Sequence, residues 1–168
     1  MQNKTPIQWQ NKMNNAKGNA FEKSILTACQ IYRNQKRAEI DKTPEPFRVM
    51  EKHNNGLFTG RFTSHAQPDF QGTICGGQSI CFEAKYTNTE RMNWNVLTNN
   101  QMKALEYHKK MGAVTGVCIG IKDNFYFIPW IVWRDMKNEF GRLYITQKDI
   151  APFRVRYRGA VMFLDYIT

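Results

Sequence analysis

The stretch SICFEAKY, residues 79–86, is the clearest strand pattern in the chain. Its even-numbered positions from Ile80 to Tyr86 are apolar or aromatic, whereas Glu83 and Lys85 stand at odd positions. Because successive side chains of a strand leave opposite faces, the apolar set predicts a face packed on a core. Glu83 and Lys85 then share the other face, where a carboxylate and an ammonium group stand side by side.

A helix is predicted on each side of this strand. Apolar residues at helical spacing begin after Gly18 and continue to about Ala38. A second helix is expected to begin at Thr98, which serves as its cap, and to end at Gly112. Gln101 stands at the reciprocal position of a capping box with Thr98, so this helix start is well defined.

Further strands follow the second helix. Residues 113–121 and 124–133 are both strongly apolar, and the sequence Lys-Asp-Asn between them favours a turn. A helical turn is expected at residues 133–141, and shorter strands are expected at 142–145 and 161–167. This order of elements predicts an α/β fold with a mixed central β-sheet flanked by helices.

The chain is expected to contain one folded domain and one arm. Residues 1–17 are rich in Asn, Gln and Lys and contain no acid, which predicts a flexible basic N-terminal arm. Residues 18–168 form a single domain, since no linker is long enough to divide them. Residues 47–50 favour a short strand, and residues 51–66 carry isolated aromatics without a burial period. We therefore expect a protruding loop or hairpin at about 51–66.

The net charge favours an anionic partner. The 168 residues include 24 Lys and Arg against 14 Asp and Glu, a formal net charge of +10. Nucleic acid is the commonest partner of such a chain, and phosphate contacts would supply most of the affinity. A solubility surface or a ribosome-type binder without chemistry fits the same charge, so the charge alone does not define an activity.

Other features of the composition narrow the class. No stretch approaches the roughly 20 apolar residues of a membrane span, and the first residues lack the apolar block of a secretory signal. The four cysteines form no close ligand pair, so we expect reduced thiols rather than a zinc site or disulfides. These features predict a cytoplasmic protein without a membrane partner.

Two acids and a lysine carry the candidate chemistry. Asp69 follows Pro68, and thirteen residues separate it from Glu83, which is followed by Lys85. Two carboxylates at one point repel each other unless a hard divalent cation lies between them, and such oxygen ligands suit Mg²⁺ or Mn²⁺. A metal of this kind polarises a phosphoryl oxygen and activates water, which phosphodiester hydrolysis requires. The alternative is a structural ion pair between Glu83 and Lys85 with Asp69 in a turn.

The motif is similar to that of the PD-(D/E)xK nuclease superfamily, and its surroundings resemble one family within it. The run PDFQGTICGGQSICFEAKYTNTERMNWNVLTNNQMKALEYHKKMGAVTGVCI resembles the RecU family of Holliday junction resolvases of Gram-positive bacteria and their phages. The matching features are the turn at residues 69–72, the block FEAKYT at 82–87, and the helix that opens around Gln101. The resemblance covers about residues 18–168 and implies a restriction-endonuclease-like fold. The short, Asn-rich chain favours a phage-type member.

The resemblance implies a role for each matching residue. Asp69 and Glu83 would be the metal ligands, and Lys85 the catalytic lysine. Gln101 matches a family glutamine near the site, and Glu22 matches an acid of the N-terminal helix that supports the metal centre. Either of these two residues could instead serve only as a helix cap. The family's Ser/Thr residues before the aspartate are replaced here by Ala-Gln-Pro, and the loop at about 51–66 matches the family's projecting stalk.

Several cations are candidates for DNA contacts. Arg61 lies among aromatic residues of the expected stalk, a mixture that suits backbone and unpaired bases, although a small apolar cluster is the alternative. Arg154, Arg156 and Arg158 alternate and would share one face of an extended segment, either on phosphates or as a solvated edge. Lys17 closes the basic arm and is also assigned to DNA.

Together these features predict a Mg²⁺-dependent endodeoxyribonuclease, in which Mn²⁺ can substitute. The family resemblance further implies that it resolves four-way DNA junctions by paired phosphodiester hydrolysis. A homodimer is expected, because the junction presents two symmetric strands. Two alternatives stay open. One is a restriction- or repair-type duplex nuclease of the same fold, and the other is a non-catalytic DNA-binding module.

Overall fold

A mixed five-stranded sheet forms the centre of the molecule in the computed structural model, which describes residues 6–44, 47–62 and 67–167. The strand order is β1-β4-β5-β7-β8. β5 and β7 pair in parallel, and the other neighbours pair antiparallel. The bounds are β1 (Ala38–Lys42), β4 (Phe70–Ile74), β5 (Ser79–Thr87), β7 (Val114–Ile121) and β8 (Asn124–Pro129).

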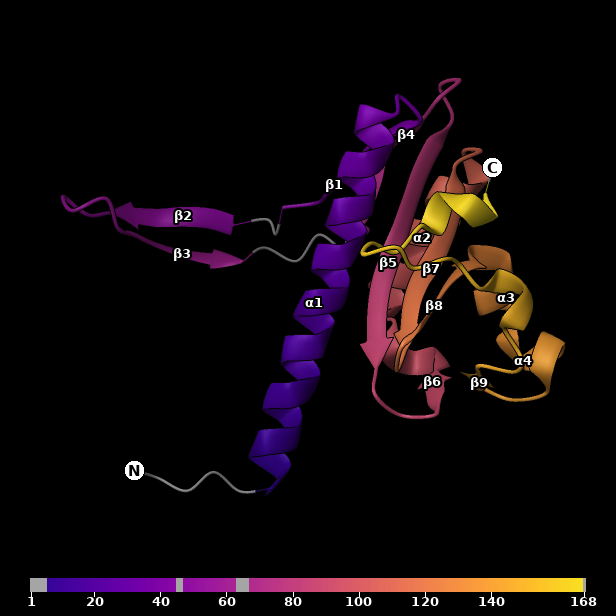
Figure 1. Cartoon of the computed structure of the whole chain (residues 1–168). Helices are drawn as coiled ribbons and strands as arrows, with labels where there is room; N and C mark the ends of the chain where they lie inside the picture. The colour runs from indigo at the N-terminus through magenta and orange to yellow at the C-terminus, as the bar shows by residue number, and fades with distance from the viewer. Residues whose placement is uncertain (1–5, 45–46, 63–66, 168) are drawn as a thin grey trace.

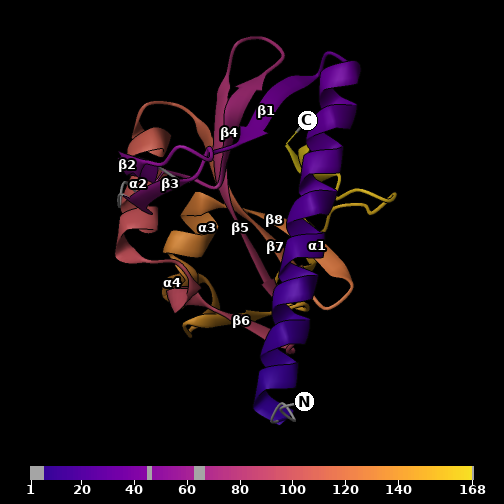
Figure 2. The same ribbon diagram turned by 90° about the vertical axis from the view of Figure 1, so that its left-hand side faces the viewer.

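Helices cover the two faces of this sheet, as Figures 1 and 2 show. One face carries the long helix α1, and the other carries α2 with the short α3 and α4. The bounds are α1 (Pro6–Asn34), α2 (Asn99–Lys110), α3 (Trp130–Arg134) and α4 (Met136–Phe140). The remaining elements are the small sheet β6 (Arg91–Asn93) with β9 (Tyr144–Thr146) and the 3₁₀ turns η1 (Trp94–Val96), η2 (Ala151–Phe153) and η3 (Phe163–Tyr166). The predicted mixed sheet flanked by helices is confirmed.

The alternation of β5 divides the core into two layers. Phe82 and Ala84 pack in the cluster under α1, where Phe82 stacks on Phe70 at 5.1 Å between ring centroids. Cys81 packs in the other cluster, which is built from α2, α3 and β7 and contains the fully buried Trp133. Apolar burial on both faces is the main stabilising term for such a sheet, and it fixes the register of β5.

A hairpin projects from the body of the molecule (Figure 1). Its strands are β2 (Phe47–Lys52) and β3 (Phe58–Phe62), and they pair only with each other in the described part of the chain. The hairpin leaves the sheet between β1 and β4, whose ends Lys42 and Phe70 are register partners. A protruding hairpin is confirmed, but it begins at Phe47 rather than near residue 51, and residues 63–66 lie outside the described residues.

The expected helix start is wrong. α1 begins at Pro6, so residues 6–17, expected as part of a flexible arm, are helical. Proline is tolerated in the first turn of a helix, and Gln, Lys and Met are good helix formers even without an apolar stripe. The helix also ends earlier than expected, because Lys36 adopts a left-handed φ of 55° and β1 starts at Ala38.

Two predictions for the C-terminal half also need correction. The strand expected at 124–133 ends at Pro129, and Trp130 begins α3. The prediction was wrong because a short apolar run does not distinguish a strand from a buried helix. The segment 161–167, expected as a strand, contains the 3₁₀ turn η3 instead. All four cysteines are free. No helix in the described ranges is long and apolar enough to cross a membrane.

Candidate active site

Strand pairing brings the two predicted carboxylates together. Phe70 on β4 is the register partner of Phe82 on β5, so the residues one step outward, Asp69 and Glu83, stand opposite each other. Asp69 is held there by its own contacts. Its Oδ2 accepts a hydrogen bond of 2.9 Å from the Ala84 backbone N–H, and its carbonyl oxygen accepts one of 2.9 Å from the N–H of Thr43. A backbone hydrogen bond to a carboxylate is a strong, charge-assisted contact that orients the side chain.

Lys85 lies against both carboxylates. Its Nζ is 3.3 Å from Glu83 Oε2 and 3.5 Å from Asp69 Oδ2. Two residues apart on a strand, Glu83 and Lys85 leave the same face, as the alternation of β5 requires. The carboxylate, the ammonium group and the second carboxylate therefore meet at one point.

Glu83 is buried, and its burial raises the pKa of its carboxyl group. Its side chain has no exposed surface, whereas Asp69 and Lys85 are partly open to solvent. Burial, followed by the negative charge of Asp69, raises the pKa of Glu83 to about 8. Lys85 opposes this rise but does not cancel it. A strongly shifted carboxyl group with a specific charged neighbour is typical of a functional site.

The donor set at this point fits a divalent cation. Within the described residues, Glu83 Oε1 is buried without a hydrogen-bond partner, which is costly for a carboxylate oxygen. Two facing carboxylates, one with an unused oxygen, offer the hard ligands that Mg²⁺ prefers, and they leave its other positions to water and phosphate. A cation between the two carboxylates would reduce their mutual repulsion and would give Glu83 Oε1 a partner.

Gln101 joins the site and caps α2 with the same amide. Its Oε1 accepts from the Thr98 backbone N–H at 3.0 Å, while Thr98 Oγ1 accepts from the Gln101 backbone N–H at 3.3 Å. This capping box leaves the amide nitrogen free to donate to Glu83 Oε2 at 2.6 Å. One end of the amide therefore caps the helix and the other contacts the carboxylate, so Gln101 is not a helix cap only.

Glu22 lies outside this contact set. It forms an ion pair with Lys42 at the end of β1. No group of three Asp, Glu, His or Cys side chains in the described ranges is arranged to hold a metal ion, so Glu22 does not complete a triad with the two carboxylates. Lys42 adjoins Thr43, which bonds to the backbone of Asp69, so the ion pair stands beside the site without being part of it.

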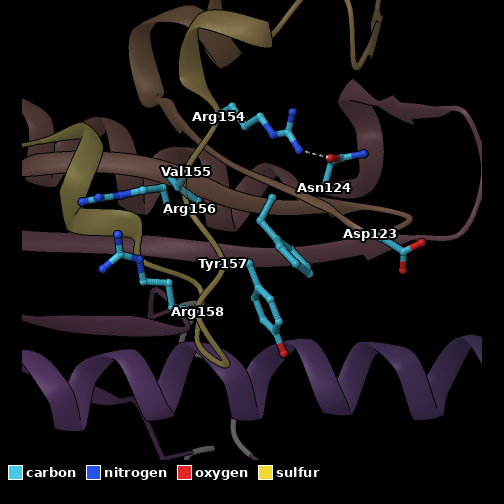
Figure 3. Close-up of a pocket in the computed structure, with 8 residues that line it drawn as sticks. Asp123, Asn124, Arg154, Val155, Arg156, Tyr157 and Arg158 are labelled. Atoms are coloured by element: carbon cyan, nitrogen blue, oxygen red, sulfur yellow. Dashed lines mark hydrogen bonds between the residues drawn. The ribbon is translucent and has the colours of Figure 1, made fainter.

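The cations predicted for DNA contacts lie in three other places. Arg61 is exposed on the hairpin, directly across from Arg48 in register. The three alternating arginines lie along an extended segment beside β8, where they line a cavity of about 440 Å³ (Figure 3). Lys17 lies on α1 and donates to Asn88 Oδ1 at 2.9 Å. None of these five predicted cations contacts the carboxylates of Asp69 and Glu83 through a described ion pair.

The predicted single face for the three arginines is only partly correct. In Figure 3 Arg156 and Arg158 extend to the same side, whereas Arg154 reaches toward Asn124 and donates to its Oδ1 at 2.6 Å. Arg156 pairs with Asp165. The backbone explains this difference, since the bridge from Arg154 to Tyr126 ties the start of the segment to the sheet.

Sequence reasoning missed two residues that support the site where β4 lies beside β1 and the residue that follows it. Thr43 fixes the backbone of Asp69, and Gly72 allows β4 to approach β1 closely. Both depend on the strand at 38–42, which begins where the expected helix was to end and which was not predicted from the sequence. The alternation of buried Ala38 and Ile40 with exposed Glu39 and Asp41 was the available signal, but five residues are too few to separate it from a helix end.

Comparison with known proteins matches most of the chain to one family. The family model described as RecU, Recombination protein U, matches residues 16–168. The solved structure of Hjc from Archaeoglobus fulgidus, described as a Holliday junction resolvase from an archaeal hyperthermophile, is similar with a TM-score of 0.49 and 14% sequence identity. That alignment covers 83% of this chain and 91% of that one. No curated protein matches the chain in sequence.

Proposed function

Since the chain belongs to the RecU family, we propose that it is a metal-dependent endonuclease that resolves four-way DNA junctions. Membership supports a junction-resolving nuclease, and the chemistry rests on one observation. Asp69 and Glu83 meet beside Lys85, and one buried oxygen of Glu83 has no partner among the described residues. Asp69 and Glu83 would hold Mg²⁺, or Mn²⁺ in its place, and the bound ion would supply charge stabilisation at the scissile phosphate and a more acidic water.

The side chains of the site have separate tasks in this proposal. Lys85 faces both carboxylates and would donate hydrogen bonds to the attacking water and to charge that develops on the phosphate. Gln101 would keep Glu83 in one orientation through its 2.6 Å hydrogen bond. Hydrolysis adds water across one P–O bond, and breakage on the 3′ side leaves a 5′-phosphate and a 3′-hydroxyl end.

Resolution of a four-way junction needs two cuts on symmetric strands. We infer that the active form is a homodimer, because a two-fold axis presents two identical sites to a substrate with the same symmetry. Such a dimer would also carry two hairpins. The exposed pair Arg48 and Arg61 on each hairpin would supply positive charge for phosphates near the centre of the junction.

A cleavage assay on three substrates tests the proposal. The wild-type protein and Glu83→Gln are incubated with Mg²⁺ on a four-way junction, a plain duplex and single-stranded DNA. We expect paired cuts in the junction alone, loss of cutting with Glu83→Gln, and junction affinity within a few-fold of wild type, because the change removes a metal ligand and no phosphate contact. Equal cleavage of the duplex would support a restriction-type nuclease, and tight binding without cleavage in Mg²⁺ or Mn²⁺ would support a binding module.

Metal binding can be measured without cleavage. Mg²⁺ should raise the Tm of the wild-type protein, because a ligand that binds only the folded state stabilises it. The same concentration should leave the Tm of Glu83→Gln nearly unchanged. An equal rise in both proteins would place the cation elsewhere and would contradict the assigned ligands.

A further inference from the structure

A groove lies on the face of the sheet opposite the two carboxylates. Glu83 and Lys85 leave β5 on the side of α2, whereas Tyr86 leaves it on the side of α1 and lines the groove. Two cavities form it, one of about 440 Å³ beside the segment 154–158 and one of about 170 Å³ against α1. They share Asp123, Phe125 and Tyr157 as lining residues, so the two cavities adjoin each other at these side chains.

Aromatic rings form the floor of the groove. Phe21 of α1 stacks on Phe125 of β8 with 5.6 Å between ring centroids. Phe125 contacts Tyr157 at 5.1 Å, and Tyr157 is 56% exposed. Tyr157 thus contacts Phe125 and keeps more than half of its surface open to solvent, so its ring is accessible to a stacking base.

The backbone that carries Tyr157 is held on both sides. The Val155 N–H donates to Phe125 O at 3.0 Å, and the Met162 N–H donates to Arg156 O at 2.9 Å. A β-bridge also joins Tyr157 to Val161, across a turn in which Gly159 has a φ of 71°. These bonds hold the backbone of Tyr157 before any ligand binds, so little backbone entropy is lost on binding.

Positive charge surrounds this aromatic floor. Five cations and one acid, Asp123, are among the residues that line the two cavities. Arg154 has a neutral acceptor, Asn124, and Arg158 has no described side-chain partner. Arg156 shares Asp165 with Arg37, so one carboxylate stands against two guanidinium charges. Guanidinium groups with spare donors are suited to phosphate oxygens.

We propose that this groove binds one strand of DNA, with an unpaired base on Tyr157 and the neighbouring phosphates on Arg154 and Arg158. A duplex does not fit this chemistry, because its bases are stacked on each other and their faces are covered. The site is separate from the carboxylates and does not depend on the proposed catalysis. It would hold an unpaired strand of a branched substrate on the α1 side while the carboxylates act on the α2 side.

Binding in EDTA tests the groove without any cleavage. Fluorescence anisotropy is measured with a labelled oligothymidylate, a duplex of the same length, and thymidine monophosphate as competitor. Tyr157→Ala should weaken oligothymidylate binding about tenfold, because stacking on an aromatic ring is lost, and Tyr157→Phe should bind like wild type. Arg158→Ala should reduce the slope of log affinity against log salt by about 0.7, the value for one single-strand phosphate contact. Lys137→Ala, an exposed lysine on α4, is the charge-matched control and should change neither quantity.

Photocross-linking locates the contact. An oligothymidylate with one 5-iodouracil should attach to Tyr157 in the wild-type protein, and this attachment should be lost in Tyr157→Ala. The proposal is overturned if Tyr157→Ala binds the oligonucleotide like wild type, or if Lys137→Ala and Arg158→Ala change the salt slope equally. It is also overturned if thymidine monophosphate binds as tightly as the oligonucleotide, since the groove would then take a free nucleotide rather than a strand.

Discussion

Glu83 is a buried carboxylate whose protonation depends on the fold. Its pKa is raised from 4.5 to about 8, so the folded protein binds a proton that the unfolded chain releases. The stabilising contribution of that proton is complete below about pH 4.5 and is lost as pH rises through about 8. Without a cation, the folded state above pH 8 must therefore keep a charged carboxylate buried beside Asp69.

This linkage predicts a pH-dependent effect of Glu83→Gln on stability. In EDTA, the Tm of the variant relative to wild type should increase between pH 5 and pH 9, because Gln carries no buried charge at high pH. Thermal unfolding at both pH values measures the difference. Glu51→Gln, at an exposed position, is the control and should show no such trend. A difference between Glu83→Gln and wild type that does not change with pH would contradict the raised pKa.

Thr98 should act on the site through Gln101. Thr98→Ala removes the hydroxyl that accepts from the Gln101 backbone, so we expect α2 to lose about 1 kcal/mol of stability. The amide that holds Glu83 then has more freedom, and junction cleavage should fall about tenfold. Urea unfolding and single-turnover cleavage measure the two effects. Thr98→Ser keeps the hydroxyl and should restore both, whereas failure of Ser to restore cleavage would exclude a positioning role.

The site residues could be predicted from the sequence to different extents. The side-by-side position of Glu83 and Lys85 followed from strand alternation alone, and the capping box placed Gln101 at the start of α2. The contact between Gln101 and Glu83 joins residues eighteen positions apart and depends on how α2 packs on β5, which no local pattern encodes. The ion pair of Glu22 with Lys42 could not be predicted either, because Lys42 belongs to a strand that was not predicted.

At the scale of elements, the missed strand β1 and the wrong end predicted for β8 share one physical cause. The edge strand β1 is short, and two of its five residues are acids, so propensity favoured a longer helix before it. α3 begins within an apolar run that continues from β8, and only Pro129 marks the change. Tertiary contacts determine the secondary structure of such segments. β1 is stabilised by pairing with β4, and α3 is stabilised by burial of Trp130 and Trp133.

Two glycines should respond in opposite ways to replacement by Ala, because Gly72 lies where β4 approaches β1 and Gly18 lies at an open position of α1. A Cβ on Gly72 would overlap the carbonyl oxygen of Glu39 and lie 2.6 Å from Ile40 Cα, so Gly72→Ala should destabilise the fold by at least about 2 kcal/mol. Gly18 lies within α1 with nothing within 4 Å of an added Cβ, so Gly18→Ala should stabilise the protein by about 0.5–1 kcal/mol. Urea denaturation measures both, and a neutral Gly72→Ala would mean that β1 and β4 are less closely paired.

At the scale of the whole molecule, the hairpin is separate from the two cores. Its described apolar side chains Val49, Met50, Leu57 and Phe58 are between 42% and 62% exposed. They belong to neither core cluster. A surface of this kind stabilises the body little, and exposed apolar groups beside Arg48 and Arg61 are suited to contact with a ligand instead.

Replacement of residues 47–62 by a short Gly-Ser linker should therefore leave the stability of the fold nearly unchanged and remove the preference for junction DNA. The linker can close the gap, because Lys42 and Phe70 at the two ends of the excursion are already register partners. We expect the Tm to stay within a few degrees of wild type, since none of the hairpin side chains that the structure describes belongs to a core cluster. Affinity for a four-way junction should fall to the level of a plain duplex, while Mg²⁺-dependent cutting of any DNA that reaches Asp69 and Glu83 persists. Competition binding with the two DNAs measures the first effect, and a variant that unfolds, or that keeps its preference for the junction, would show that the hairpin is not the element that selects branched DNA.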